Sequence, residues 1–145
     1  MQVQKKVEVL NRKASFEYHF LEVFTAGLVL SGTEIKSIRT GKVNITDAYC
    51  AFFQDELFVR NLHISPYALG THYNHEPLRD RKLLLSKREL RKLQKELKNV
   101  GLTIIPTKLF ISDKGLAKIN IALAKGKKLY DKREDIKARD LSREE

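Results

Sequence analysis

Residues 118 to 123 alternate between polar or small side chains and large apolar ones, and this alternation ends near Gly126. The large apolar positions are Ile119, Ile121 and Leu123, which a strand places on one buried face. Four lysines and no acidic residue lie between residues 118 and 128, namely Lys118, Lys125, Lys127 and Lys128. We therefore predict a packed body over residues 1–126, whose last strand carries positive charge, and a flexible charged tail over residues 127–145.

The size and charge of the chain narrow the classes to which it can belong. Its 145 residues, 42% of them hydrophobic, suit one domain with a single core, and Cys50 in an apolar run predicts a buried thiol. The net charge of +10 at pH 7 favours either nucleic acid or an anionic membrane as partner. No apolar run approaches the roughly 20 residues of a membrane span, and no signal-type segment opens the chain. We therefore expect a cytoplasmic protein without a membrane partner.

Strand-type patterns fill most of the body. Residues 16–30 predict one long strand with a bulge or bend at Ala26 and Gly27. Two hairpins are predicted, one from residues 47–53 and 57–65, the other from residues 102–111 and 115–123, with Pro106 near an edge or bulge. Combined with two helices, these strands predict a mainly β fold, a small antiparallel β-barrel.

The two helices are predicted from their end signals. Residues 32–40 follow Ser31, residues 86–99 begin with Ser86, and a glycine closely follows each segment. In the second segment Ser86 and Glu89 have the spacing of a capping box. The apolar stripe of that helix consists of Leu90, Leu93 and Leu97.

Three segments predict irregular structure. Residues 1–13 are a polar lead-in, and residues 66–82 form a connection long enough to suggest a function. Residues 127–145 carry too few apolar side chains to fold onto the body. We expect this tail to be disordered alone and helical when bound in a groove.

The sequence contains little that suggests an enzyme. His72 and His75 are three positions apart, but no suitably spaced third ligand joins them, so a polar loop is the better interpretation than a metal site. There is no glycine-rich phosphate loop after a strand and no supported Ser-His-Asp arrangement. We therefore predict a protein that is not an enzyme, with no metal and no cofactor.

Basic and polar side chains instead recur around the body, as the positioning of phosphates requires. These residues are Asn11, Arg12, Lys13, Lys36, Arg39, Asn74, Arg79, Arg81, Lys118 and Lys125. Residues 79–98 form the most basic segment, with nine cations and three acids. Because small barrels of the OB type bind oligonucleotides on a sheet face and its loops, the combination favours an RNA-binding protein.

Several ordered segments resemble those of one family. They are NRKA at residues 11–14, AG at 26–27, GTEIKS at 32–37, HISPY at 63–67, PLRDRKLLL at 77–85 and AKGKKLYDKR at 124–133. Together they resemble the signature segments of SmpB, the SsrA-binding proteins of bacterial trans-translation. The resemblance spans nearly the whole chain. The predicted RNA-binding residues also include Lys82, Lys127 and Lys128 in these segments and His75 in the connection over residues 66–82.

This resemblance implies an OB-type β-barrel with flanking helices. It implies binding to the tRNA-like domain of tmRNA, which the protein accompanies with elongation factor Tu into the empty A site of a stalled ribosome. The tail would then lie as a helix in the vacant mRNA channel, with Tyr130, Asp131, Lys132 and Arg133 at the small-subunit decoding centre.

The sequence departs from the family pattern at two positions. Thr25 stands where the family often has Glu, and Ser86 stands where it often has Asn or His, although capping accounts for Ser86 without RNA. Family tails also commonly run several residues further than Glu145. We expect a monomeric, non-catalytic adaptor for ribosome rescue; the alternative is a ribosome-associated structural RNA-binding protein, and an RNA-modifying enzyme is a distant third.

Overall fold

The structure is a computed structural model that describes residues 7–70 and 74–127. Its strands are β1 (Glu8–Leu10), β2 (Tyr18–Leu28), β3 (Val43–Asn44), β4 (Tyr49–Phe53), β5 (Glu56–Arg60), β6 (His63–Ile64), β7 (Arg81–Leu84), β8 (Leu102–Ile111) and β9 (Ala117–Gly126). Its helices are α1 (Arg12–Glu17), α2 (Gly32–Arg39) and α3 (Lys87–Glu96). The predicted mainly β fold with flanking helices is therefore confirmed.

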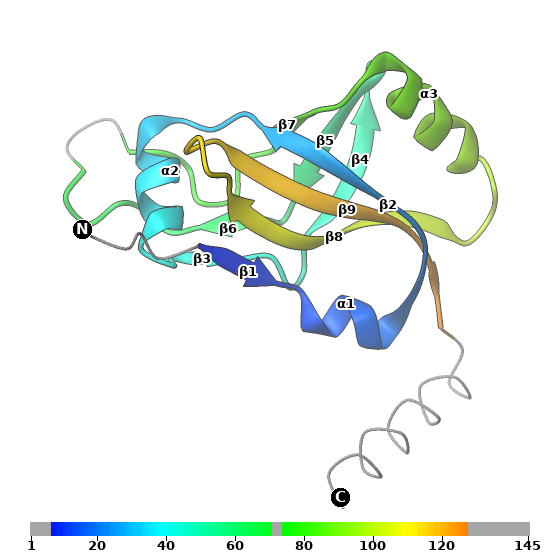
Figure 1. Ribbon diagram of the computed structural model, residues 1–145, viewed down its shortest axis with the longest axis horizontal. Coiled ribbons are helices and arrows are strands. Elements are labelled where there is room, and N and C mark those ends of the chain that lie inside the picture. The colour runs from blue at the N-terminus through cyan, green and yellow to red at the C-terminus, as the bar shows by residue number, and fades with distance from the viewer. Residues whose placement is uncertain (1–6, 71–73, 128–145) are drawn as a thin grey trace, which may run out of the picture.

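The main sheet closes into a ring. Its strand order is β1-β8-β4-β5-β7-β2-β9, and β9 pairs in turn with β8, so that every strand except β1 belongs to the closed ring. All these pairings are antiparallel, and β3 and β6 form a small separate sheet. In Figure 1 the long strands β2, β8 and β9 run side by side across the molecule.

The interior of the ring is filled by the side chains that the alternation assigns to one face. Ile119, Ile121 and Leu123 are all buried there, as their spacing predicts. Phe24 of β2 and Cys50 of β4 belong to the same core, and burial raises the pKa of the Cys50 thiol. The prediction that this cysteine packs as a small hydrophobe is thus confirmed.

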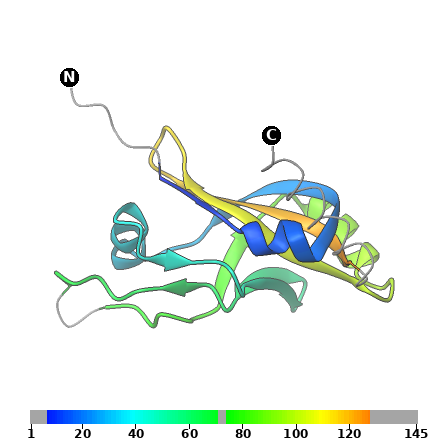
Figure 2. The same ribbon diagram turned by 90° about the horizontal axis from the view of Figure 1, so that it is seen from below.

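The two predicted helices are confirmed with small shifts of their ends. The Ser86 hydroxyl accepts a hydrogen bond from the Glu89 N–H at 3.2 Å, and the Glu89 carboxylate accepts one from the Ser86 N–H at 3.1 Å. Leu93 is fully buried beneath α3. The helices α2 and α3 lie toward opposite ends of the ring in both views (Figures 1 and 2).

The start of the chain differs from the prediction. Within the expected lead-in, β1 pairs with β8, and Asn11 then caps α1, which covers the first residues of the expected long strand. The second strand therefore begins only at Tyr18. The register of β2 is irregular between Phe20 and Glu22 and unbroken at Ala26 and Gly27, so of the predicted bulge or bend there, the bulge is wrong.

The middle of the chain differs as well. The strand predicted over residues 57–65 is divided into β5 and β6, because Asn61 has a positive φ of 59°. The end of the predicted irregular connection, in turn, forms β7, which pairs with both β5 and β2. The bulge expected near Pro106 is present, between Pro106 and Lys108.

The predicted properties of the tail, residues 128–145, lie outside the described residues. Within residues 7–70 and 74–127, none of the helices has the length and apolar character needed to cross a membrane.

Candidate nucleic-acid interface

The structure separates the predicted RNA-binding residues by exposure. Exposed side chains belong to Arg12, Lys13, Lys36, Arg39, Asn74 and Lys125, and partly exposed ones to His75, Arg79, Lys82, Lys118 and Lys127. Asn11 and Arg81 are buried. Lys128, Tyr130, Asp131, Lys132 and Arg133 lie outside the described part of the chain. The buried residues and the exposed ones therefore need separate accounts.

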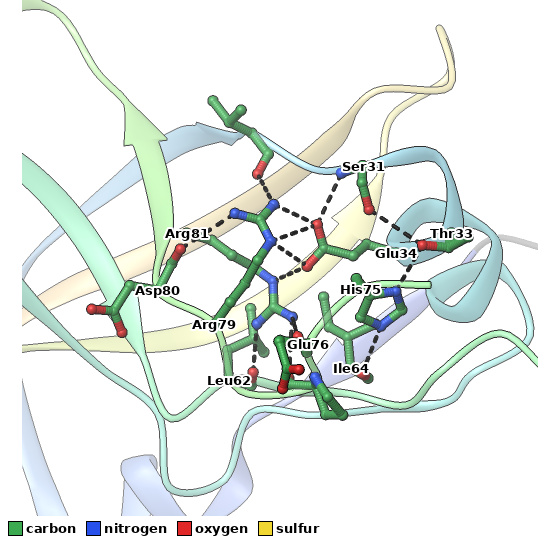
Figure 3. A network of polar contacts seen from close by, with 12 residues as sticks. Ser31, Thr33, Glu34, Leu62, Ile64, His75, Glu76, Arg79, Asp80 and Arg81 are labelled. Carbon is green, nitrogen blue, oxygen red and sulfur yellow. Dashed lines mark hydrogen bonds and ion pairs between the residues drawn. The ribbon is translucent and has the colours of Figure 1, made fainter. Parts of the chain in front are cut away.

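Arg81 of β7 is held inside the protein by a carboxylate and by main-chain oxygens (Figure 3). Its Nε donates to the carboxylate of Glu34, and its Nη1 donates to Leu62 O at 2.6 Å. Its Nη2 donates to Glu76 O at 3.3 Å and to Pro77 O at 3.1 Å. Both charged side chains have no exposed surface. The prediction that Arg81 contacts RNA is therefore corrected, because its guanidinium is enclosed and each of its three nitrogens donates to an acceptor inside the protein.

Arg79 shares the same carboxylate but reaches the surface, where 36% of its side chain is exposed. Its Nη2 donates to Glu34 Oε1 at 2.5 Å and to Val29 O at 3.3 Å. The cluster of Glu34, Arg79 and Arg81 thus contains one negative and two positive charges. Its surplus positive charge lies with the half-exposed Arg79, so this residue stays a candidate for contact with an anion.

The ionisation of Glu34 follows from these contacts. Burial alone would raise the pKa of Glu34, but hydrogen bonds from Arg79, the Ser31 N–H and Arg81 outweigh it and lower the pKa from 4.5 to about 2. Burial lowers the pKa of Arg81, and Glu34 opposes this shift. The carboxylate therefore stays charged at neutral pH.

Glu34 is the residue of this site that the sequence analysis did not identify. It lies at the third position of α2, where its Oε1 also accepts a hydrogen bond from the Ser31 N–H at 2.9 Å. The spacing of Ser31 and Glu34 is that of a capping box, and this was the available signal. Glu34 joins two of the family-like segments, residues 32–37 and 77–85, which are far apart in the chain.

Asn74 and His75 shape the connection that precedes β7. The Asn74 side chain accepts from the Tyr67 N–H at 3.1 Å and donates to Tyr67 O at 2.9 Å. The His75 ring lies 2.8 Å from Ile64 O through Nε2 and 2.8 Å from the Thr33 hydroxyl through Nδ1. Because a carbonyl oxygen only accepts, Nε2 is the donor to Ile64 O. Both side chains thus serve first to position this loop.

Asn11 also has a structural role. The residue is only 4% exposed, and its Oδ1 accepts a hydrogen bond from the Ala14 N–H at 3.1 Å, which caps the start of α1. Its Nδ2 donates to Pro106 O at 2.9 Å and to Ile45 O at 3.3 Å. The prediction that Asn11 contacts RNA is therefore corrected, since its amide is buried and fully used.

The predicted RNA-binding cations on the surface divide into those that form an ion pair and those that do not. Lys13 lies 3.5 Å from Asp47, and Lys82 lies 3.1 Å from Glu56. Five others form no ion pair with a described residue: Arg12, Lys36, Arg39, Lys118 and Lys125. Of these, Lys36 lies over the ring of Tyr67, 5.6 Å from its centre. These five side chains keep their charge available for phosphate.

Lys118, one of these five cations, lies on the outer face of the sheet. Lys118 of β9 lies opposite Gly27 of β2 and opposite Phe110 of β8. The neighbouring pair is Thr25 and Asn120, whose side chains are joined by a hydrogen bond of 2.8 Å. Thr25 thus has a partner within the sheet.

The described residues form no group suited to a metal ion. In the described ranges, no group of three or more His, Cys, Asp or Glu side chains is placed to hold a metal ion. The closed sheet thus carries positive side chains distributed over its surface, and these side chains can bind an anion.

Comparison of the sequence with known proteins identifies one family. The sequence matches the family described as "SmpB protein" over residues 8–145. It is 58% identical over 141 residues to an SsrA-binding protein of Christiangramia forsetii, covering 97% of this chain and 90% of the relative. It is 48% identical over 141 residues to the SsrA-binding protein of Moorella thermoacetica, covering 97% of this chain and 91% of that one.

A solved structure shares the fold. It is a chain from "tmRNA-SmpB: a journey to the center of the bacterial ribosome", with a TM-score of 0.73 and 42% sequence identity, covering 90% of this chain and 94% of the other. The family match extends over nearly all of the sequence. The chain therefore belongs to the SmpB family.

Proposed function

We propose that this protein is a non-catalytic adaptor that binds the tRNA-like domain of tmRNA and brings it to the A site of stalled ribosomes for peptide tagging. The observation that carries the proposal is the family match over residues 8–145, with relatives named SsrA-binding protein. The unpaired cations around the ring supply the charge that an RNA partner needs. The adaptor acts as a monomer in the cytoplasm, and elongation factor Tu is an indirect partner.

The roles divide between body and tail. In the body, Arg12, Lys36, Arg39, Lys118 and Lys125 contact phosphates, while Lys13, Lys82 and Lys127 add positive charge nearby. Asn74, His75 and Arg79 shape and charge the connection before β7. In the tail, Lys128 continues the basic edge, and Tyr130, Asp131, Lys132 and Arg133 meet the ribosomal decoding centre, where a ring stacks on a base and cations meet phosphate.

The first experiment asks which RNA the protein carries. The full chain is purified from a bacterial host, and its bound RNA is sequenced after washing in high salt. An adaptor retains one abundant structured RNA, tmRNA, and stays a monomer. A ribosomal structural protein would instead remain with ribosomal subunits, which would reject the proposal in favour of its alternative.

The second experiment separates body from tail. A chain stopped after Lys127 keeps every described element, so we expect near-native melting and tmRNA affinity but no tagging of a peptide from a transcript without a stop codon. Replacing Tyr130, Asp131, Lys132 and Arg133 by Ala reproduces much of the loss. Normal tagging by the shortened chain, or loss of its affinity for isolated tmRNA, contradicts this division of roles.

A further inference from the structure

The last described residue of the chain is bonded to helix α1. After β9 ends, the Lys127 N–H donates to Glu17 O at 2.8 Å, and the Lys127 ammonium donates to Ser15 O at 3.3 Å. The end of β9 also pairs with the start of β2, Gly126 opposite Tyr18. In Figure 1 the orange end of β9 accordingly passes close to α1. The chain thus leaves the ring at a point where it is held on two sides.

The chemistry of this contact suits a helix end. The last carbonyl groups of a helix lack partners within the helix, and a cation near them is favourable. The last turn of α1 contains no basic residue of its own. Lys127 supplies both an N–H donor and a cation from elsewhere in the chain. The contact therefore satisfies carbonyl groups at the end of α1 and also fixes the end of β9 in place.

Helix α1 is in turn fixed to the ring. Asn11 caps its start and ties it through Pro106 O to β8 and through Ile45 O to the loop before β4. Ala14 packs against Ile105 and Ala124 on the outer side of the sheet. Because α1 has only six residues, it depends on these contacts rather than on its own helical stability.

From these contacts we infer that α1 sets the direction in which the chain leaves the ring after β9. Asn11 is a positioning residue because it holds α1 on the ring, and Lys127 is one because it holds the end of β9 on α1. The inference rests on the proposed function of the tail. The proposed function requires the tail to enter the mRNA channel, whose position is fixed relative to the RNA-bound body. The tail reaches this channel more often when the end of β9 points in one direction than when its direction varies.

A different role of α1 predicts a different outcome. Arg12 and Lys13 on α1 are exposed, and the proposed function already counts them among the contacts to RNA. If RNA contact is the only role of α1, disturbing α1 lowers tagging no more than it lowers tmRNA binding. Under the inference, tagging falls much further than the affinity for isolated tmRNA.

The test variant is Asn11→Asp in the full chain. An aspartate still accepts the Ala14 N–H, but it replaces the donor that Ile45 O and Pro106 O require with an oxygen. The matched control is Asn44→Asp, because Asn44 is exposed and its side chain accepts from the Thr46 N–H at 2.9 Å without donating to another described residue. If Asn11→Asp does not fold, Asn11→Ser removes the same two donations without adding a charge.

Three quantities are measured on each variant: amide hydrogen exchange of Lys127 by NMR, affinity for isolated tmRNA, and tagging on stalled ribosomes. For Asn11→Asp we expect exchange at Lys127 to accelerate about tenfold or more while Phe24 in β2 stays protected. Tagging is expected to fall about tenfold, with tmRNA affinity within about twofold of the parent. Asn44→Asp is expected to match the parent in all three.

Two outcomes overturn the inference. One is normal tagging by a variant whose Lys127 amide exchanges freely; the other is a loss of tmRNA affinity in proportion to the loss of tagging. The chain stopped after Lys127 keeps the two failures apart. If that chain tags normally, the proposed role of the tail is wrong. If it does not tag, but the Asn11→Asp variant with a freely exchanging Lys127 amide tags normally, only the inferred role of α1 is wrong.

Discussion

Glu34 on α2 and Arg81 on β7 form an ion pair in which both side chains are completely buried, although they are 47 positions apart in the chain. The pair fastens α2 to the ring and closes the connection that carries Asn74, His75 and Arg79. A buried pair of this kind costs much to break, because the remaining charge is left without a partner. The loops that present the proposed RNA contacts therefore depend on Glu34.

The first prediction concerns Glu34→Gln. Removing the carboxylate leaves two guanidinium groups beside each other, so we expect a loss of about 3 kcal/mol or more in the free energy of unfolding. The matched control is Glu56→Gln, which breaks the exposed pair with Lys82 and should cost less than about 1 kcal/mol. Both are measured by urea denaturation at pH 7, and equal losses in the two variants contradict the prediction.

The second prediction concerns acid. The folded-state pKa of Glu34, about 2, lies below its ordinary value of 4.5, so its contribution is present above pH 4.5 and is lost as the pH falls toward 2. The shift corresponds to about 3 kcal/mol. We expect the stability difference between the parent and Glu34→Gln to shrink steadily between pH 4.5 and pH 2. A difference that stays constant over this range refutes the assigned ionisation.

The third prediction concerns Ser86, one of the departures from the family pattern. Its hydroxyl caps α3, so Ser86→Ala should lower the free energy of unfolding by about 1 kcal/mol. Ser86→Asp restores an acceptor and should recover most of that loss. The affinity for tmRNA should be the same in all three proteins. A weaker affinity in both variants, without a change in stability, would instead identify Ser86 as an RNA contact.

Part of this fold could be predicted because its causes are local. Ile119 and Ile121 alternate with small or polar neighbours, and Ser86 with Glu89 marks a helix start within one turn. Asn11 and Arg81 could not be placed in this way, since their partners Pro106 and Glu34 lie 95 and 47 positions away. In sequence, a polar residue that is buried and fully hydrogen-bonded is indistinguishable from one that faces solvent. For this reason two structural residues were predicted to contact RNA.

The last prediction concerns two lysines of β9, Lys118 on its outer face and Lys125 near its end. Lys118 and Lys125 form no ion pair with a described residue, so each can neutralise a phosphate and release a counterion. Replacing both by Gln should weaken tmRNA binding and lower the slope of log affinity against log salt by about 2 in total, roughly one unit per contact. The slope is measured by titrating isolated tmRNA into the protein at several salt concentrations.

A matched double variant separates this local effect from that of net charge. Lys92 is paired with Glu22 at 2.8 Å, and Lys114 lies exposed in the turn between β8 and β9. Replacing these two by Gln lowers the net charge from +10 by the same two units, yet should leave the slope within about half a unit of the parent. If both double variants reduce the slope equally, tmRNA responds to overall charge. If only the Lys118 and Lys125 variant does so, these two positions of β9 are part of the RNA interface.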